Sequence, residues 1–104
     1  MTGRPKSYPE KDLEDARLAI LKELSNQTSG SMSLEQLVSA LADWGHRKSD
    51  TEVKQLLNDL LEARGVTLFN SSVRLIADIT REGLNHVAGR QALAGVKKPF
   101  SSLD

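Results

Sequence analysis

The sequence has 104 residues, of which 38% are hydrophobic and only 4% aromatic, and it contains no cysteine. This length fits one domain with an aliphatic core, and the lack of cysteine excludes disulfides, thiolate nucleophiles and thiolate metal ligands. The net charge is zero, but residues 12–62 carry five basic against ten acidic side chains, whereas both ends of the chain are basic.

No segment of the sequence has the composition of a membrane span. The apolar runs are all shorter than the roughly 18 residues that a spanning helix needs. The polar start of the chain, residues 1–12, lacks the apolar stretch of a signal peptide. We therefore expect a soluble, cytoplasmic protein with no membrane partner.

Residues 12–25 are predicted to form the first helix, because their apolar side chains recur at helical spacing. These side chains are Leu13, Ala16, Ile20, Leu21 and Leu24. Pro9 lies just upstream, where the helix cannot yet have begun. Residues 25–33 are small and polar around Gly30, which predicts a loop with one short extended stretch near Met32.

Two capping boxes mark the next two helices. A serine is followed three residues later by a residue whose side chain can reach back, first at Ser33 and then at Ser49. An apolar face follows each box. The first consists of Leu34, Leu37, Val38 and Leu41, and the second of Val53, Leu56, Leu57, Leu60 and Leu61. Gly45 and Gly65 suit the left-handed position after the last turn, so these helices are expected to end there.

The pattern then changes from helix to strand. Residues 66–69 and 73–79 hold most of the β-branched and aromatic side chains, and the turn-forming residues 70–72 separate them, which predicts a β-hairpin. Thr80 can cap a fourth helix that fades between Arg90 and Leu93. The apolar face expected for this helix consists of Leu84, Val87 and Ala88.

We expect one folded domain, residues 12–94, between flexible tails at residues 1–11 and 95–104. Both tails are basic. Their cations are Arg4, Lys6, Lys11, Lys97 and Lys98. The tails can contribute phosphate contacts, or they can be ordinary solubilising sequence.

Three helices, a hairpin and a last helix follow one another in the order of a winged-helix domain. The segment VKQLLNDLLEARGVTLF, residues 53–69, resembles the third helix and following strand of ArsR-type and MarR-type regulators. IADITREGLNHVAGR, residues 76–90, resembles the end of their wing and the start of their last helix. Together with GVKKP at residues 95–99, the chain from about residue 12 to 98 is similar to a family of small winged-helix proteins of Mu-like phages and prophages.

The resemblance implies a mainly α fold with a small β-hairpin, arranged as a winged helix-turn-helix with a three-helix core, a wing and a C-terminal helix. It further implies a DNA-binding transcriptional regulator of a phage or prophage, active as a homodimer that pairs through the first and fourth helices. The cysteine-containing metal site of ArsR-type sensors is absent from the chain, so thiolate metal sensing is excluded.

Double-stranded DNA is the expected partner, and the candidate contacts begin just before the third helix. Arg47, Lys48 and Ser49 follow His46 at the place where a phosphate would meet a helix N-terminus. Polar residues of the third helix are candidates for contacts with base edges. They are Thr51, Lys54, Gln55 and Asn58.

The predicted hairpin adds Ser72 and Arg74, since basic wing residues of the resembling regulators often reach a minor groove or a phosphate. Plainer explanations exist for the same residues. Arg74 can be an exposed strand residue, and the segment before the third helix can be a solvated turn in which Ser49 and Glu52 act only as caps.

The charge of the third helix favours a different function. Residues 49–64 carry four acidic side chains against two basic ones, whereas a helix in a major groove normally has a positive surplus. The alternative is a protein-interaction module that keeps the winged-helix fold. Its acidic third helix would contact a basic partner in phage assembly or replication.

We recognise no pattern for catalysis, cofactor binding or metal binding. The sequence shows no nucleophile with a positioned base, no paired-carboxylate cleft and no phosphate-binding glycine loop. His46 and His86 lack the spacing of metal ligands. We therefore expect a non-enzymatic protein without a cofactor or metal. Trp44, the single tryptophan, is expected to pack on the core beneath the turn after the second helix.

Overall fold

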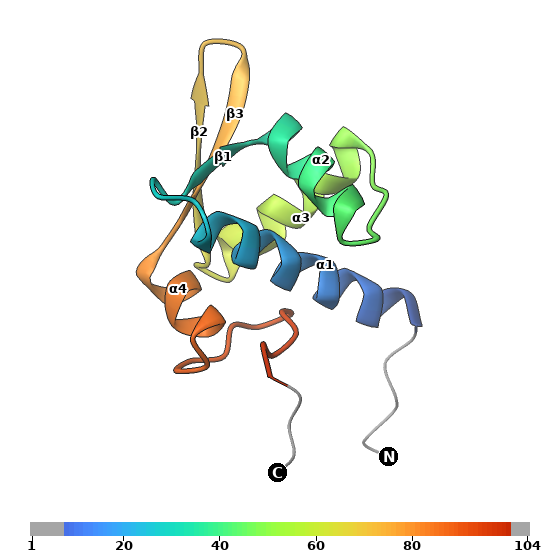
Figure 1. The fold of residues 1–104 in the computed structure, drawn as a ribbon, viewed down its shortest axis with the longest axis vertical. Coiled ribbons are helices and arrows are strands. Elements are labelled where there is room, and N and C mark those ends of the chain that lie inside the picture. The colour runs from blue at the N-terminus through green and yellow to red at the C-terminus, as the bar shows by residue number, and fades with distance from the viewer. Residues whose placement is uncertain (1–7, 101–104) are drawn as a thin grey trace.

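A computed structural model of the protein describes residues 8–100, which form four helices and a three-stranded antiparallel sheet. The elements in chain order are α1 (Tyr8–Ser25), β1 (Ser31–Ser33), α2 (Leu34–Asp43), α3 (Asp50–Glu62), β2 (Val66–Ser71), β3 (Arg74–Ile79) and α4 (Arg81–Val87). The hairpin of β2 and β3 projects beyond the helices at one end of the molecule, and α4 lies towards the other (Figure 1). The predicted mainly α architecture with a small hairpin is confirmed.

Helix α1 is the centre of the core and packs against α2, α3, α4 and β3. Ala16, Ile20, Leu21 and Leu24 are fully buried, and every residue of α1 after Leu13 is buried or half-buried. Leu13 itself was expected in the apolar stripe but is 36% exposed.

The start of α1 corrects the predicted boundary of the N-terminal tail. The helix begins at Tyr8 rather than at residue 12, and Pro9 lies inside its first turn. Proline is tolerated there, because the first N–H groups of a helix have no intrahelical acceptor. Residues 1–7 of the expected tail lie outside the described residues.

Both predicted capping boxes are present. Ser33 Oγ accepts from the Gln36 N–H at 3.2 Å, while Gln36 Oε1 accepts from the Ser33 N–H at 2.9 Å, and Ser49 pairs with Glu52 in the same way. Each helix buries the apolar face that follows its box. These residues are Leu34, Leu37 and Leu41 in α2 and Val53, Leu56, Leu57 and Leu60 in α3. Leu61 is the exception at 43% exposed, because the buried arc of α3 ends at Leu60.

The two glycines that follow these helices play different roles. Gly45 adopts the expected left-handed conformation with φ 89°, and the next N–H, of His46, closes the end of α2 by donating to the Leu41 carbonyl. After α3, however, Arg64 takes the left-handed conformation with φ 70°. Gly65 is buried instead, and a Cβ there would lie 2.9 Å from Leu93 Cδ1, so the Leu93 side chain would have to shift.

The sheet has the strand order β1-β3-β2. β1 is the extended stretch expected near Met32, and Met32 and Leu68 flank the buried Ala77 on either side in register. The inner face of the hairpin lies on the core through side chains such as Val66, whereas Phe69 lies on the opposite face and is 48% exposed. The sheet thus joins the hairpin to the start of α2.

Helix α4 turns a different face inward than predicted. Leu84 is 47% exposed, whereas Gly83 and His86 are buried. The reason is the close approach of α4 to the chain after α3, where a Cβ on Gly83 would lie 2.4 Å from the Gly65 carbonyl oxygen. The helix also ends at Val87, earlier than the expected range of Arg90 to Leu93.

The C-terminal segment, residues 88–100, folds back onto the helices. Leu93 and Val96 are buried, and the Lys97 N–H donates to the Glu14 carbonyl of α1 at 3.2 Å. The expected flexible tail from residue 95 is therefore wrong as far as residue 100, because an apolar residue and backbone hydrogen bonds hold this stretch. Residues 101–104 lie outside the described residues.

Candidate nucleic-acid interface

Helix α3 has a continuous polar face opposite its buried leucines. Thr51, Lys54, Gln55 and Asn58 are all exposed, and their spacing of three and four residues places them in one stripe. All four sequence candidates on this helix thus lie on the same accessible surface. Gln55 is the one with a partner on the helix, since its Nε2 donates to Asp59 Oδ1 at 3.2 Å.

The cap of α3 uses the polar groups of Ser49. Its hydroxyl accepts from the Glu52 N–H at 3.1 Å, and its own N–H donates to Glu52 Oε1 at 2.8 Å. The hydrogen bonds from Ser49, the backbone one first, lower the pKa of Glu52. The simple capping explanation for Ser49 and Glu52 therefore accounts for their observed contacts.

The three basic residues before α3, His46, Arg47 and Lys48, differ in their exposure to solvent. Arg47 is exposed, but Lys48 is an ion-pair partner of α1, with Nζ 2.8 Å from Asp12 Oδ2 and its side chain 16% exposed. His46 is only 6% exposed and also faces α1. The hydrogen bond from Lys48 is the largest cause of the lowered pKa of Asp12. Of the three adjacent basic residues, only Arg47 is thus free to meet a ligand.

Sequence reasoning missed the partners of this segment, because Asp12 lies 36 residues from Lys48 and Asp15 lies 31 residues from His46. The available signal was the spacing of the two carboxylates, which lie three residues apart and so on one side of α1. That spacing does not show which later residue they meet.

The hairpin presents Arg74 and Ser72 at its tip. Ser72 has φ 55° in the turn, Val73 beside it is 95% exposed, and Arg74 opens β3 with an exposed side chain. Within residues 8–100, neither Arg74 nor the exposed Arg47 and Lys54 forms an ion pair. Three uncompensated cations thus lie on the α3 entry, the α3 polar face and the hairpin.

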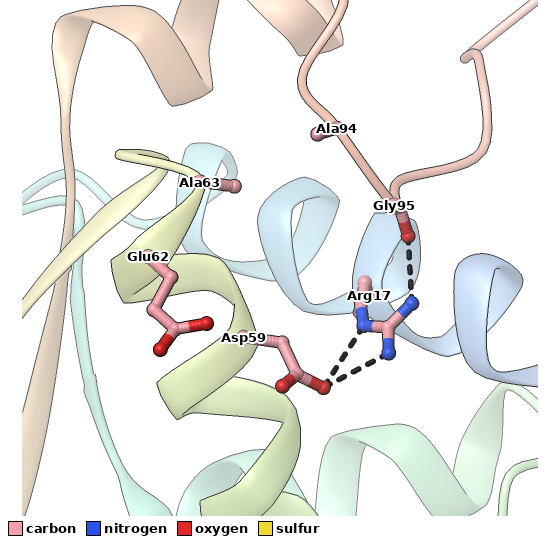
Figure 2. Close-up of a pocket in the computed structure, with 6 residues that line it drawn as sticks. All are labelled: Arg17, Asp59, Glu62, Ala63, Ala94 and Gly95. Carbon is pink, nitrogen blue, oxygen red and sulfur yellow. Dashed lines mark hydrogen bonds and ion pairs between the residues drawn. The ribbon is translucent and has the colours of Figure 1, made fainter.

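An open pocket of about 310 Å³ lies between α1, the end of α3 and the C-terminal segment (Figure 2). Its charged side chains are Arg17, Asp59 and Glu62. The first two are committed to each other, with Arg17 Nη2 2.9 Å from Asp59 Oδ2. Glu62 is exposed and forms no ion pair with the described part of the chain. The Arg17–Asp59 pair therefore fixes the position of α3 rather than offering a free charge.

Trp44 does not cap the core as expected. It is 45% exposed and lies against the outside of α1, where its Nε1 donates to Glu23 Oε2 at 2.6 Å and Lys22 Nζ lies 5.7 Å from the ring centroid. The prediction was wrong: the core at the end of α2 holds Leu41, which is fully buried, and Trp44 lies outside it. Trp44 therefore connects the end of α2 to α1 through contacts on the protein surface.

The two histidines have separate environments. His86 is fully buried. Its Nδ1 accepts a hydrogen bond from the Leu93 N–H at 2.9 Å, and its Nε2 lies 2.8 Å from the Lys97 carbonyl oxygen.

Within residues 8–100, no three histidine, aspartate or glutamate side chains are grouped so as to hold a metal ion. The helices of the same range include none with the length and apolar character of a membrane span.

Comparisons of the chain with protein-family models, with curated proteins and with solved structures found no match.

Proposed function

We propose that the protein is a winged-helix domain that binds duplex DNA, with α3 as the recognition helix and the β2–β3 hairpin as the wing. The observation that carries the proposal is the polar face of α3, exposed along its length and accompanied by three cations without ion-pair partners. Arg47, Lys54 and Arg74 supply these charges.

The side chains on this face match the chemistry of DNA. Amide groups such as those of Gln55 and Asn58 can pair with adenine edges in the major groove, and a lysine such as Lys54 can pair with guanine. Arginines at the entry to α3 and on the hairpin suit phosphate contacts, which position the protein on the duplex. By its resemblance to regulators of phages and prophages, the domain would control transcription.

Fluorescence anisotropy with random duplex DNA at low and physiological salt tests the proposal. Phosphate contacts make log affinity fall linearly with log salt, so measurable binding with a clear salt slope is expected. Absence of binding to random duplexes at low salt, together with recovery of no sequence from a genomic-DNA selection, would rule the proposal out.

A second function is favoured by the acidic residues of α3. Asp50, Glu52 and Glu62 are exposed on this helix, against the single exposed cation Lys54. A basic protein partner would complement such a surface. Under this alternative, the same fold serves as a protein-interaction module in phage assembly or replication.

Glu62→Lys distinguishes the two functions. It should strengthen binding to DNA, because it adds a cation beside the polar face, and it should weaken binding to a basic partner. Asp59 is unsuitable for the same test, because its substitution would break the ion pair with Arg17. Glu62→Gln serves as the matched control for loss of the carboxylate alone.

Homodimerisation is part of the proposal, but the burial of α1 restricts its geometry. After Leu13 the residues of α1 are buried or half-buried, and Asp15, whose side chain is 46% exposed, is bound to His46, so α1 offers a second copy mainly its first turns. Helix α4 has a larger exposed surface for a contact with a second copy. Arg81 and Leu84 are exposed on the helix, and so is Ala88 at its C-cap.

A further inference from the structure

His46 joins three elements of the fold. Its backbone N–H donates to the Leu41 carbonyl at 2.8 Å and closes the end of α2. Its side chain, 6% exposed, lies between two carboxylates of α1, with Nδ1 3.3 Å from Asp12 Oδ1 and Nε2 2.8 Å from Asp15 Oδ2. Arg47 is the next residue, and Ser49 begins the cap of α3. The position of His46 therefore sets how the chain enters α3.

The two carboxylates make the contacts of the ring depend on its protonation. A protonated imidazole donates from both ring nitrogens, so it satisfies Asp12 and Asp15 at once. A neutral ring donates from one nitrogen only and turns a lone pair toward the other carboxylate. One of the two contacts is then lost or becomes repulsive. The turn before α3 is therefore bound less firmly to α1.

The other charged groups around the ring do not replace this contact. Lys48, from the same turn, lies 2.8 Å from Asp12, and Lys97, from the C-terminal segment, lies 3.4 Å from Asp15. Lys97 is 60% exposed and contacts Asp15 through the oxygen that His46 does not use. These two lysines partly compensate the carboxylates, but only His46 bridges both of them.

We infer that His46 is a positioning residue for the proposed DNA contact: held between Asp12 and Asp15, it fixes the turn that carries Arg47 into α3, and its protonation tightens DNA binding. The inference rests on the proposed function and adds a form of regulation to it. Only a protonated ring can donate to both carboxylates, so the charge of His46 determines how firmly α1 holds the turn.

The test is the DNA affinity of the full chain from about pH 5.5 to about pH 8 at constant ionic strength. The wild-type affinity is expected to fall several-fold as the pH rises. His46→Gln keeps one donor but cannot be protonated, so its affinity should stay near the weak, high-pH value throughout. Lys97→Met is the matched control, because it removes the neighbouring cation of Asp15 and keeps the ring, and its pH profile should be as steep as that of the wild type.

Asp15→Asn provides a second variant in case His46→Gln is poorly folded. Asp15 is 46% exposed, and its substitution leaves the ion pair of Lys48 with Asp12 in place. This variant should show a flattened pH profile together with a wild-type far-ultraviolet circular dichroism spectrum. A pH profile as steep as that of the wild type would overturn the inference.

A readout without DNA separates this inference from the proposed function. In the free protein, the amide chemical shifts of Arg47 and Ser49 should follow the titration of the His46 ring. If they do while no DNA is bound under any condition, the positioning of the turn stands and the proposed function fails. If DNA is bound but these shifts are independent of the ring, and wild type and His46→Gln share one pH profile, the inference is overturned.

Discussion

Arg17 of α1 and Asp59 of α3 form an ion pair in which two guanidinium nitrogens donate to one carboxylate oxygen, Nε at 3.2 Å and Nη2 at 2.9 Å. The third nitrogen, Nη1, donates to the Gly95 carbonyl at 2.8 Å. One side chain thus ties the recognition-helix candidate and the C-terminal segment to the central helix (Figure 2). The orientation of α3 depends on this pair as well as on its leucines.

Loss of this ion pair should lower the stability of the fold. Asp59→Asn is expected to reduce the free energy of unfolding by about 1 kcal/mol, because the pair is only partly shielded from water. Arg17→Met should cost more, since it also removes the contact with Gly95. Urea unfolding followed by the fluorescence of the single Trp44 measures both, and Glu62→Gln, on a neighbouring carboxylate without an ion pair, should leave the midpoint unchanged.

Gly83 should not tolerate a side chain. A Cβ at this position would lie 2.4 Å from the Gly65 carbonyl oxygen, which is backbone and cannot rotate away. Gly83→Ala is therefore expected to destabilise the protein by about 2 kcal/mol or more, although alanine is the better helix former. Thermal unfolding checks this, with Arg81→Ala on the exposed face of the same helix as the control. Equal melting temperatures for Gly83→Ala and the wild type would show that α4 packs differently.

Acid should weaken the contact between α1 and the turn before α3. The pKa of Asp12 is lowered, chiefly by the hydrogen bond from Lys48 and, against the opposing effect of burial, by the charges of Lys48 and His46. A lowered folded-state pKa contributes stability above the unfolded value, about 3.8, and that stability is lost as the pH falls through the folded value. Asp12→Asn should therefore flatten the decline of stability below about pH 4. A decline identical to that of the wild type would contradict this prediction.

The capping boxes were predictable from the sequence because capping is local. Ser33 with Gln36, and Ser49 with Glu52, lie within one turn of each other, so residue type and spacing determine the contact. The roles of Lys48 and Trp44 were not predictable in this way. Their partners lie 36 and 21 residues away on α1, and only the packing of the helices brings them together.

The same distinction explains the errors at the C-terminus. The composition of residues 95–100, with glycine, lysines and proline, favours a tail. Its order comes from the burial of Val96 and from contacts with Glu14 and His86, which are made across the fold. Among the DNA-contact candidates, the polar stripe of α3 followed from helical periodicity, whereas the burial of Lys48 depended on tertiary packing.

Leu84 offers a test of the proposed homodimer. It is 47% exposed on a short helix whose other side is packed against the chain. If α4 pairs the subunits, Leu84→Glu should shift the protein to the monomer, because it places two carboxylates in an apolar contact. Sedimentation at several concentrations measures this, with Lys98→Glu as a control for added negative charge at an exposed position outside α4. A wild-type protein that is monomeric at every concentration would remove the dimer from the proposal.

The central claim is that the polar face of α3 and the hairpin bind duplex DNA, and the most direct measurement is the salt dependence of binding after their free cations are removed together. Each phosphate contact contributes about 0.9 to the slope of log affinity against log salt. The triple variant Arg47→Ala, Lys54→Ala, Arg74→Ala should therefore bind more weakly and lose up to about 3 in slope. Arg90→Ala, which removes an exposed cation beyond α4, should bind as the wild type does. If the first triple variant kept the wild-type affinity and slope, DNA binding through this face would be contradicted.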